Sequence, residues 1–104
     1  MCANEIEQCN DGEIFAVPYS DNGKMRVIIV KNDGEVIETL NVNEICGTDE
    51  LSIPIVGFRN PLVTACFNRE NDLAVVMYHR FERKHYMFTY SWRDKKILRE
   101  PICT

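Results

Sequence analysis

The sequence has few of the residues that catalytic and metal-binding motifs require. Its 104 residues include only two histidines, three serines and five glycines, and no two glycines are adjacent. Without clustered glycines there is no phosphate-binding loop. No two cysteines have the Cys-x-x-Cys spacing of zinc or redox motifs. We therefore expect no catalytic residue, no metal ligand and no cofactor, and a protein that is not an enzyme.

Long apolar runs are also absent. The longest strongly apolar stretch covers residues 73–78, far short of the roughly 20 residues that cross a membrane as a helix. The first twelve residues are polar and acidic, unlike a signal peptide, and no Asn-x-Ser/Thr sequon occurs. We expect no membrane contact.

The cysteines are odd in number. There are five, and we interpret them as free thiols in the cytoplasm or another reducing intracellular compartment. Cys66 lies in an apolar strand pattern, so we expect a small buried core residue there.

Apolar residues alternate with polar ones along most of the chain, and turn residues recur every 6–12 positions. This pattern is typical of an all-β, mainly antiparallel meander. We expect seven or eight strands in a small sandwich or barrel. Residues 1–12 would be a polar N-terminal segment, and residues 13–104 a single β domain. Short helical turns are expected at 4–9 and 42–46, the second capped by Gly47. The candidate strands are 13–19, 25–31, 35–41, 52–58, 62–68, 73–81, 84–92 and 96–100.

The sequence predicts registers for two hairpins. Asn22-Gly23 favours a two-residue type I′ turn, which pairs Asp21 with Lys24. Both faces of this hairpin are apolar, and Pro18 indicates an edge position or a bulge. A second turn at 32–34 has two or three residues.

For the last large hairpin, a two-residue loop at Glu82-Arg83, or a four-residue loop in the same register, would pair Leu73 with Trp92 and His79 with Tyr86. His79 and His85 would then face opposite sides of the sheet, which excludes a shared metal site. We expect His79 to be partly buried, with its hydrogen bonds satisfied. The predicted core consists of Phe15, Val17, Val27, Ile29, Leu40, Ile53, Ile55, Val63, Ala65, Phe67, Leu73, Val75, Met77, Phe88, Tyr90 and Trp92.

One resemblance concerns strand lengths and hairpins. The segments 62–67, 73–79, 86–92 and 96–98 together resemble one four-stranded blade of a WD-type β-propeller, and 27–40 resembles the two outer strands of another. A propeller has four or more blades, whereas 104 residues supply at most two. A stand-alone sandwich or barrel is therefore favoured, and a blade-like pair that completes a partner is the alternative.

Charge is distributed unevenly along the chain. Residues 1–50 contain eleven acidic and three basic residues, a balance of −8, and residues 51–104 contain five acidic and nine basic residues, a balance of +4. We predict a non-catalytic protein-interaction module, a small subunit of a larger assembly, whose acidic half contacts a basic protein surface. The identity of this protein partner is unknown, and homo-oligomerisation is an alternative. The predicted contact residues are Glu35, Glu38, Glu44, Asp49 and Glu50.

The C-terminal third supports a different function. Basic residues there alternate with aromatic ones, the combination that single-stranded nucleic acids bind by stacking and phosphate neutralisation. The first alternative is thus an RNA- or ribonucleoprotein-binding β module, and the second is a β-barrel that binds a small ligand. The nucleic-acid contacts would be Arg80, Arg83, Lys84, His85, Arg93, Lys95 and Lys96.

Overall fold

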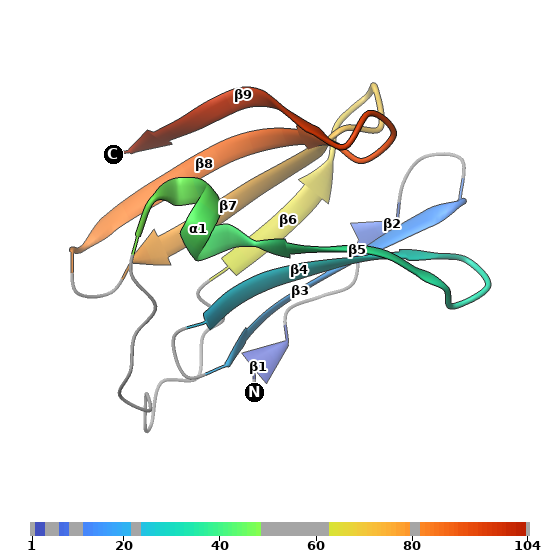
Figure 1. Ribbon diagram of the computed structural model, residues 1–104, viewed down its shortest axis with the longest axis horizontal. Helices are drawn as coiled ribbons and strands as arrows, with labels where there is room; N and C mark the ends of the chain where they lie inside the picture. Colours follow the sequence, from blue (N-terminus) through green and yellow to red (C-terminus); the bar gives the residue numbers. More distant parts are fainter. Residues whose placement is uncertain are drawn as a thin grey trace.

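The computed structural model describes residues 2–3, 7–8, 12–21, 24–48, 63–79 and 82–103. Over these ranges the chain forms two antiparallel sheets that are not closed into a barrel (Figure 1). The all-β prediction is confirmed. Of the three architectures it named, the barrel is not observed, and the two sheets are consistent with the small sandwich.

The first sheet, sheet A, is formed by the N-terminal part of the chain. Its strands run in the order β1-β3-β4-β5, and β2 also pairs with β3. A short helix, α1, follows β5 directly. The bounds are β1 (Cys2–Ala3), β2 (Glu7–Gln8), β3 (Ile14–Asp21), β4 (Lys24–Lys31), β5 (Val36–Asn41) and α1 (Val42–Cys46).

The second sheet, sheet B, is a meander in the order β6-β7-β8-β9. Its strands are β6 (Val63–Phe67), β7 (Leu73–His79), β8 (Lys84–Ser91) and β9 (Lys96–Cys103). Seven of the eight predicted strands thus correspond to observed ones, and the strand predicted at 52–58 lies outside the described residues.

The two sheets contact each other along β3 and β6. The edge strands β5 and β9 are the last strands of their sheets at the opposite side. The sheets therefore meet where β6, the edge strand of sheet B, lies beside β3, which is flanked in its own sheet by β4 and by β1 and β2. On the opposite side, no described strand pairs with the outer edges of β5 and β9.

The predicted register of the Asn-Gly hairpin is confirmed, since Asp21 pairs with Lys24 and the pairing continues to Ile14 and Lys31. The prediction that Phe15 and Val17 are core residues is wrong, because both are only partly buried. Both faces of β3 are apolar, and the face that packs against sheet B is the one carrying Ala16 and Pro18. Along the edge of β3 that is turned away from β4, residues 19 and 20 pair with β1, and residues 15 and 16 pair with β2. Pro18 lies between these two short pairings. The missing N–H of this proline therefore costs no ladder hydrogen bond there.

The register predicted for the β7–β8 hairpin is wrong by two residues. Leu73 pairs with Tyr90 and His79 pairs with Lys84, so four residues separate the paired ends. Arg83 adopts a positive φ of 55° and closes this longer turn. A shift of two preserves the alternation of faces, so the predicted inward face is correct although the pairs are not.

That shift moves Trp92 out of the strand and into the turn before β9. Its ring is only partly buried, which corrects its assignment to the core. The indole Nε1 donates a hydrogen bond to the backbone oxygen of Asn71 at 2.8 Å, and the Arg93 guanidinium lies 4.6 Å from the ring centroid.

The turn between β4 and β5 has three residues. Lys31 N–H donates to the Glu35 oxygen at 2.8 Å, and Gly34 adopts a φ of 94°. This conformation suits glycine because it has no Cβ. In the β4–β5 pair next to this turn, the register shifts between Ile29 and Val30.

The helical turn predicted at 42–46 is confirmed as α1. The Asn41 side chain accepts the Glu44 N–H at 3.2 Å at its start, and Gly47, with a φ of 69°, ends it as predicted. The side-chain oxygen of buried Asn43 accepts the Met25 N–H at 2.7 Å, which holds α1 on the start of β4. The turn predicted at 4–9 is wrong where it is described, because Glu7 and Gln8 form β2.

The core lies between the inward faces of the sheets. Ten of the predicted core residues are buried, and Phe67, like Trp92, is only partly buried. Ile53 and Ile55 are outside the described residues. Cys66 is exposed, not buried, because Val63 and Ala65 occupy the inward positions of β6 and Cys66 alternates to the outside. Core residues that the sequence analysis missed are Ile14, Ala16, Met25 and Val42.

Within the described ranges, no helix combines the length and apolar character that crossing a membrane requires.

Candidate functional site

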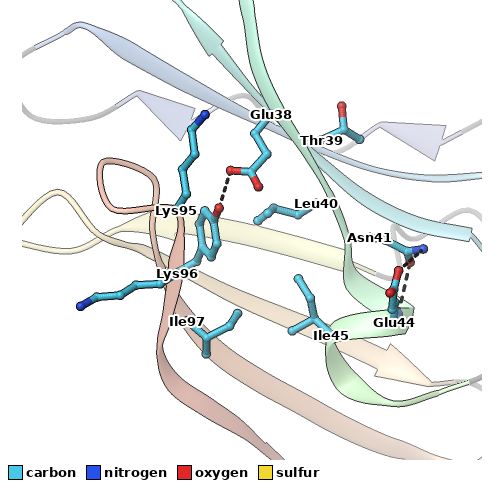
Figure 2. A pocket seen from close by; sticks show the side chains of 10 residues that line it. Glu38, Thr39, Leu40, Asn41, Glu44, Ile45, Lys95, Lys96 and Ile97 are labelled. Carbon is cyan, nitrogen blue, oxygen red and sulfur yellow. Dashed lines mark hydrogen bonds between the residues drawn. The ribbon is translucent and has the colours of Figure 1, made fainter.

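A groove opens between the β5–α1 segment and the turn that leads into β9, at the unjoined side of the sandwich (Figure 2). Its volume is about 350 Å³. The side chains of Leu40, Ile45 and Ile97 converge on its floor, and Tyr90 is also among its lining residues. We call it the mouth groove, and its charged lining residues are Glu38, Glu44, Lys95 and Lys96.

A hydrogen bond crosses the mouth groove between the two sheets. The Tyr90 hydroxyl on β8 donates to the Glu38 carboxylate on β5 (Figure 2). Burial, and then the bond to Glu38, raise the pKa of Tyr90 well above its usual range, because both disfavour the phenolate. Tyr90 therefore keeps its proton and acts as a donor at neutral pH.

The acidic residues predicted as partner contacts are held by neighbours in this chain. Glu38 accepts from Tyr90, Glu44 accepts from the Asn41 side-chain amide at 3.4 Å, and the Glu35 carboxylate lies 3.3 Å from the Lys31 amine. Glu38 and Glu44 share the mouth groove, whereas Glu35 lies at the β4–β5 turn. Asp49 and Glu50 are outside the described residues.

The residues predicted to contact nucleic acid separate into two groups. Lys95 and Lys96 line the mouth groove and are exposed, and neither side-chain amine has a hydrogen bond or ion pair to a described residue. Arg93, in the same turn, stacks on Trp92 and donates to the Glu70 backbone oxygen at 3.2 Å.

The second group lies at the other end of β8. Arg83 and Lys84 are exposed there, and the His85 ring packs beside Tyr78 on the outward face of sheet B, with 4.8 Å between ring centroids. Arg80 is outside the described residues. Among the described residues, part of the acidic set and part of the basic set thus line one groove together.

The two histidines do face opposite sides of sheet B. His79 is buried on the inward face and His85 is exposed on the outward face. The Nδ1 of His79 accepts the Glu82 N–H at 3.2 Å, and its buried Nε2 has no hydrogen-bond partner among the residues that the structure describes. Where the chain is described, no three His, Cys, Asp or Glu side chains gather closely enough to hold a metal ion.

Sequence reasoning did not find the mouth groove as a site. Its floor combines residues 40 and 45 with residues 90 and 97, and no motif links segments so far apart. The only signal was that Glu38, Glu44, Lys95 and Lys96 were all candidate contacts, though for two different functions.

Searches against protein-family models, curated proteins and solved structures found no match to this chain.

Proposed function

We propose that the protein is a non-catalytic interaction module that binds a segment of another protein in the mouth groove, and that it serves as a small subunit of a larger assembly. The observation that carries the proposal is the apolar floor, formed by Leu40, Ile45 and Ile97, lying between two charged walls. An apolar centre with a polar rim is the usual composition of a protein interface.

The dimensions support a chain segment over a small molecule. A volume of about 350 Å³ is at the low end of the range of roughly 300–1,000 Å³ for small-molecule pockets, which bury most of their ligand. This groove is open to solvent along its length and suits a ligand that extends beyond it. Two further large apolar side chains, Met87 and Leu98, are exposed on sheet B and offer additional surface to an assembly.

The test uses a library of displayed twelve-residue peptides selected on the immobilised wild-type protein. Enriched peptides are then titrated against Ile97→Trp, which fills the groove floor, and against Ile102→Trp. The second variant is a matched control because Ile102 is on the same strand, is 55% exposed and is not among the residues that line the groove.

We expect enriched peptides to bind wild type and Ile102→Trp alike, and to lose at least tenfold in affinity for Ile97→Trp. Circular dichroism establishes that both variants are folded. If no peptide is enriched, or if the enriched peptides bind Ile97→Trp as well as wild type, the mouth groove is not the contact site.

A further inference from the structure

The mouth groove lies between two walls of opposite charge. The wall formed by β5 and α1 carries Glu38 and Glu44, and the wall formed by β9 and the turn before it carries Lys95 and Lys96 (Figure 2). The hydroxyl and the amide that donate to the two carboxylates are neutral groups, so they leave both negative charges in place. Among the described residues, no ion pair joins one wall to the other. The lining is therefore balanced in charge, and its charges are divided by sign between the two walls.

Apolar surface and backbone groups are left uncovered beside these charges. Ile45 and Ile97 on the groove floor are only partly buried. The strands that border the groove, β5 and β9, have outer edges with which no described strand pairs. Such edges present rows of N–H and C=O groups to other chains. An occupant that covers this site therefore has to match an apolar centre, two open edges and two walls of opposite sign.

A second copy of this chain meets these requirements in one orientation. When two identical grooves face each other across a twofold axis that runs along the groove, each acidic wall lies opposite the basic wall of the other copy. A twofold axis perpendicular to the groove would instead oppose walls of the same sign, which is destabilising. Twofold dimers are the commonest oligomers, because a single self-complementary patch serves both copies. The charge pattern of the walls thus selects one twofold arrangement.

We propose that two copies of the chain associate as a twofold dimer through the mouth groove, so that the acidic wall of each copy faces Lys95 and Lys96 of the other. This arrangement covers the floor and both open edges in a single contact. It also regulates the site, because the second copy occupies the floor that a partner segment would contact. The dimer is then the resting form, and a partner segment binds by displacing one copy. The regulation rests on the proposed function, whereas the dimer itself does not.

Sedimentation velocity with charge-reversed variants tests the dimer. Wild type should change from the monomer mass of 12.1 kDa to twice that mass as its concentration rises from about 5 to about 500 μM. No larger species should form, because a twofold contact closes on itself. The variant Lys95→Glu, Lys96→Glu should associate at least tenfold more weakly, since only acidic walls are then opposed. The variant Thr39→Lys, Glu44→Lys should lose as much, since Thr39 also lines the groove and the opposed walls become basic.

An equimolar mixture of these two variants is the decisive measurement. In a mixed dimer the two altered walls face each other and the two native walls face each other, so association should return to within about threefold of wild type. The matched control is Arg83→Glu, Lys84→Glu. It makes the same change in charge at the other end of β8, and Arg83 has a positive φ of 55°, close to the 52° of Lys95. Its association should also remain within about threefold of wild type.

Circular dichroism establishes that every variant is folded. A wild type that stays monomeric over the whole concentration range, or that forms species larger than a dimer, would overturn the proposal. So would a mixture of the two variants that does not regain association, or a control that loses as much as Lys95→Glu, Lys96→Glu.

The displacement of one copy is measured separately. An enriched peptide added to the wild-type dimer should convert it to a complex of one chain with one peptide, again by sedimentation velocity. A peptide that binds while the dimer persists would overturn the regulation. The measurements on the protein alone need no peptide, so a selection that enriches nothing defeats the proposed function and the regulation that rests on it, but not the dimer. A monomeric wild type that binds enriched peptides defeats the dimer and leaves the proposed function intact.

Discussion

The hydrogen bond from Tyr90 to Glu38 should contribute measurably to stability, because it joins the two sheets across the mouth groove. Replacing Tyr90 with phenylalanine removes the hydroxyl and keeps the ring, which is part of a residue only 4% exposed. A hydrogen bond to a charged acceptor contributes about 1.5–3 kcal/mol. Glu38 is only half-buried, so we expect the lower end, about 1.5 kcal/mol, after partial solvent screening. For a domain of this size that corresponds to a decrease in Tm of roughly 6–12 °C.

A double-mutant cycle isolates the bond from other effects of each substitution. Urea unfolding of wild type, Tyr90→Phe, Glu38→Ala and the double variant can be followed by the fluorescence of the single tryptophan. We expect a coupling energy of about 1–1.5 kcal/mol. The control Tyr78→Phe should change stability by less than about 0.5 kcal/mol. A coupling below about 0.3 kcal/mol would refute the reasoning, since distant and independent residues give values of that size.

The same bond predicts how stability depends on pH. The pKa of Tyr90 is raised above the ordinary value of 10.0 in the folded chain, so the stabilisation is complete below about pH 10 and is lost as the pH rises through the folded-state pKa. Wild type should therefore lose stability above pH 10 more steeply than Tyr90→Phe. Parallel urea titrations at pH 9 to 11 measure the difference, and identical slopes would contradict the assignment.

Four other predictions concern the turn before β9, the thiols and the basic residues. Trp92→Ala should lower the free energy of unfolding by about 2 kcal/mol, less than the loss of a fully buried tryptophan would. Unfolding is followed by circular dichroism, and a decrease above about 4 kcal/mol would contradict the half-buried position of Trp92. The intact mass under non-reducing conditions should equal that of the fully reduced chain, and a deficit of two or four hydrogens would show disulfides. Burial raises the pKa of the Cys46 thiol to about 11, so at pH 8 iodoacetamide should alkylate it more slowly than the exposed thiols, and equal rates would contradict its burial. Finally, titration with labelled single-stranded RNA and DNA at about 50 and 200 mM salt should show no tight binding; micromolar affinity with a steep salt dependence, abolished by Arg80, Arg83, Lys84→Glu, would favour the nucleic-acid alternative.

Local signals in the sequence determined much of the fold. The Asn22-Gly23 turn specified a register that the structure reproduces through eight residue pairs, because a two-residue loop leaves no freedom in how the strands align. The β7–β8 hairpin shows the opposite case. Its loop has no glycine, and nothing in the pattern indicated that Arg83 would adopt a positive φ. The alternation of apolar and polar residues predicted which side chains of this hairpin face inward. It could not detect a register shift of two residues, because such a shift leaves the faces unchanged.

The remaining features depend on which surfaces meet in three dimensions. Phe15 and Ala16 lie on opposite apolar faces of β3, and only the position of sheet B decides that Ala16 is buried. The mouth groove depends on the same arrangement, because Glu38 and Tyr90 are 52 residues apart and approach only when the sheets pack. Alternation along a strand contains no information on the order or packing of sheets, so the candidate site could not be located from the sequence.

The division of the chain into two consecutive meanders has a consequence for how it folds. Among the described residues, 2–41 supply the strands of sheet A and 63–103 those of sheet B, and no described strand crosses from one sheet to the other. Strand pairing therefore closes mainly short loops, which gives a lower contact order than a Greek-key sandwich and favours rapid folding. Hairpins form in about 1–10 μs, and the contacts between the sheets require closure of a much longer loop. We expect each meander to form early and the two to dock late, so that contacts between the sheets control the rate of unfolding more than the rate of folding.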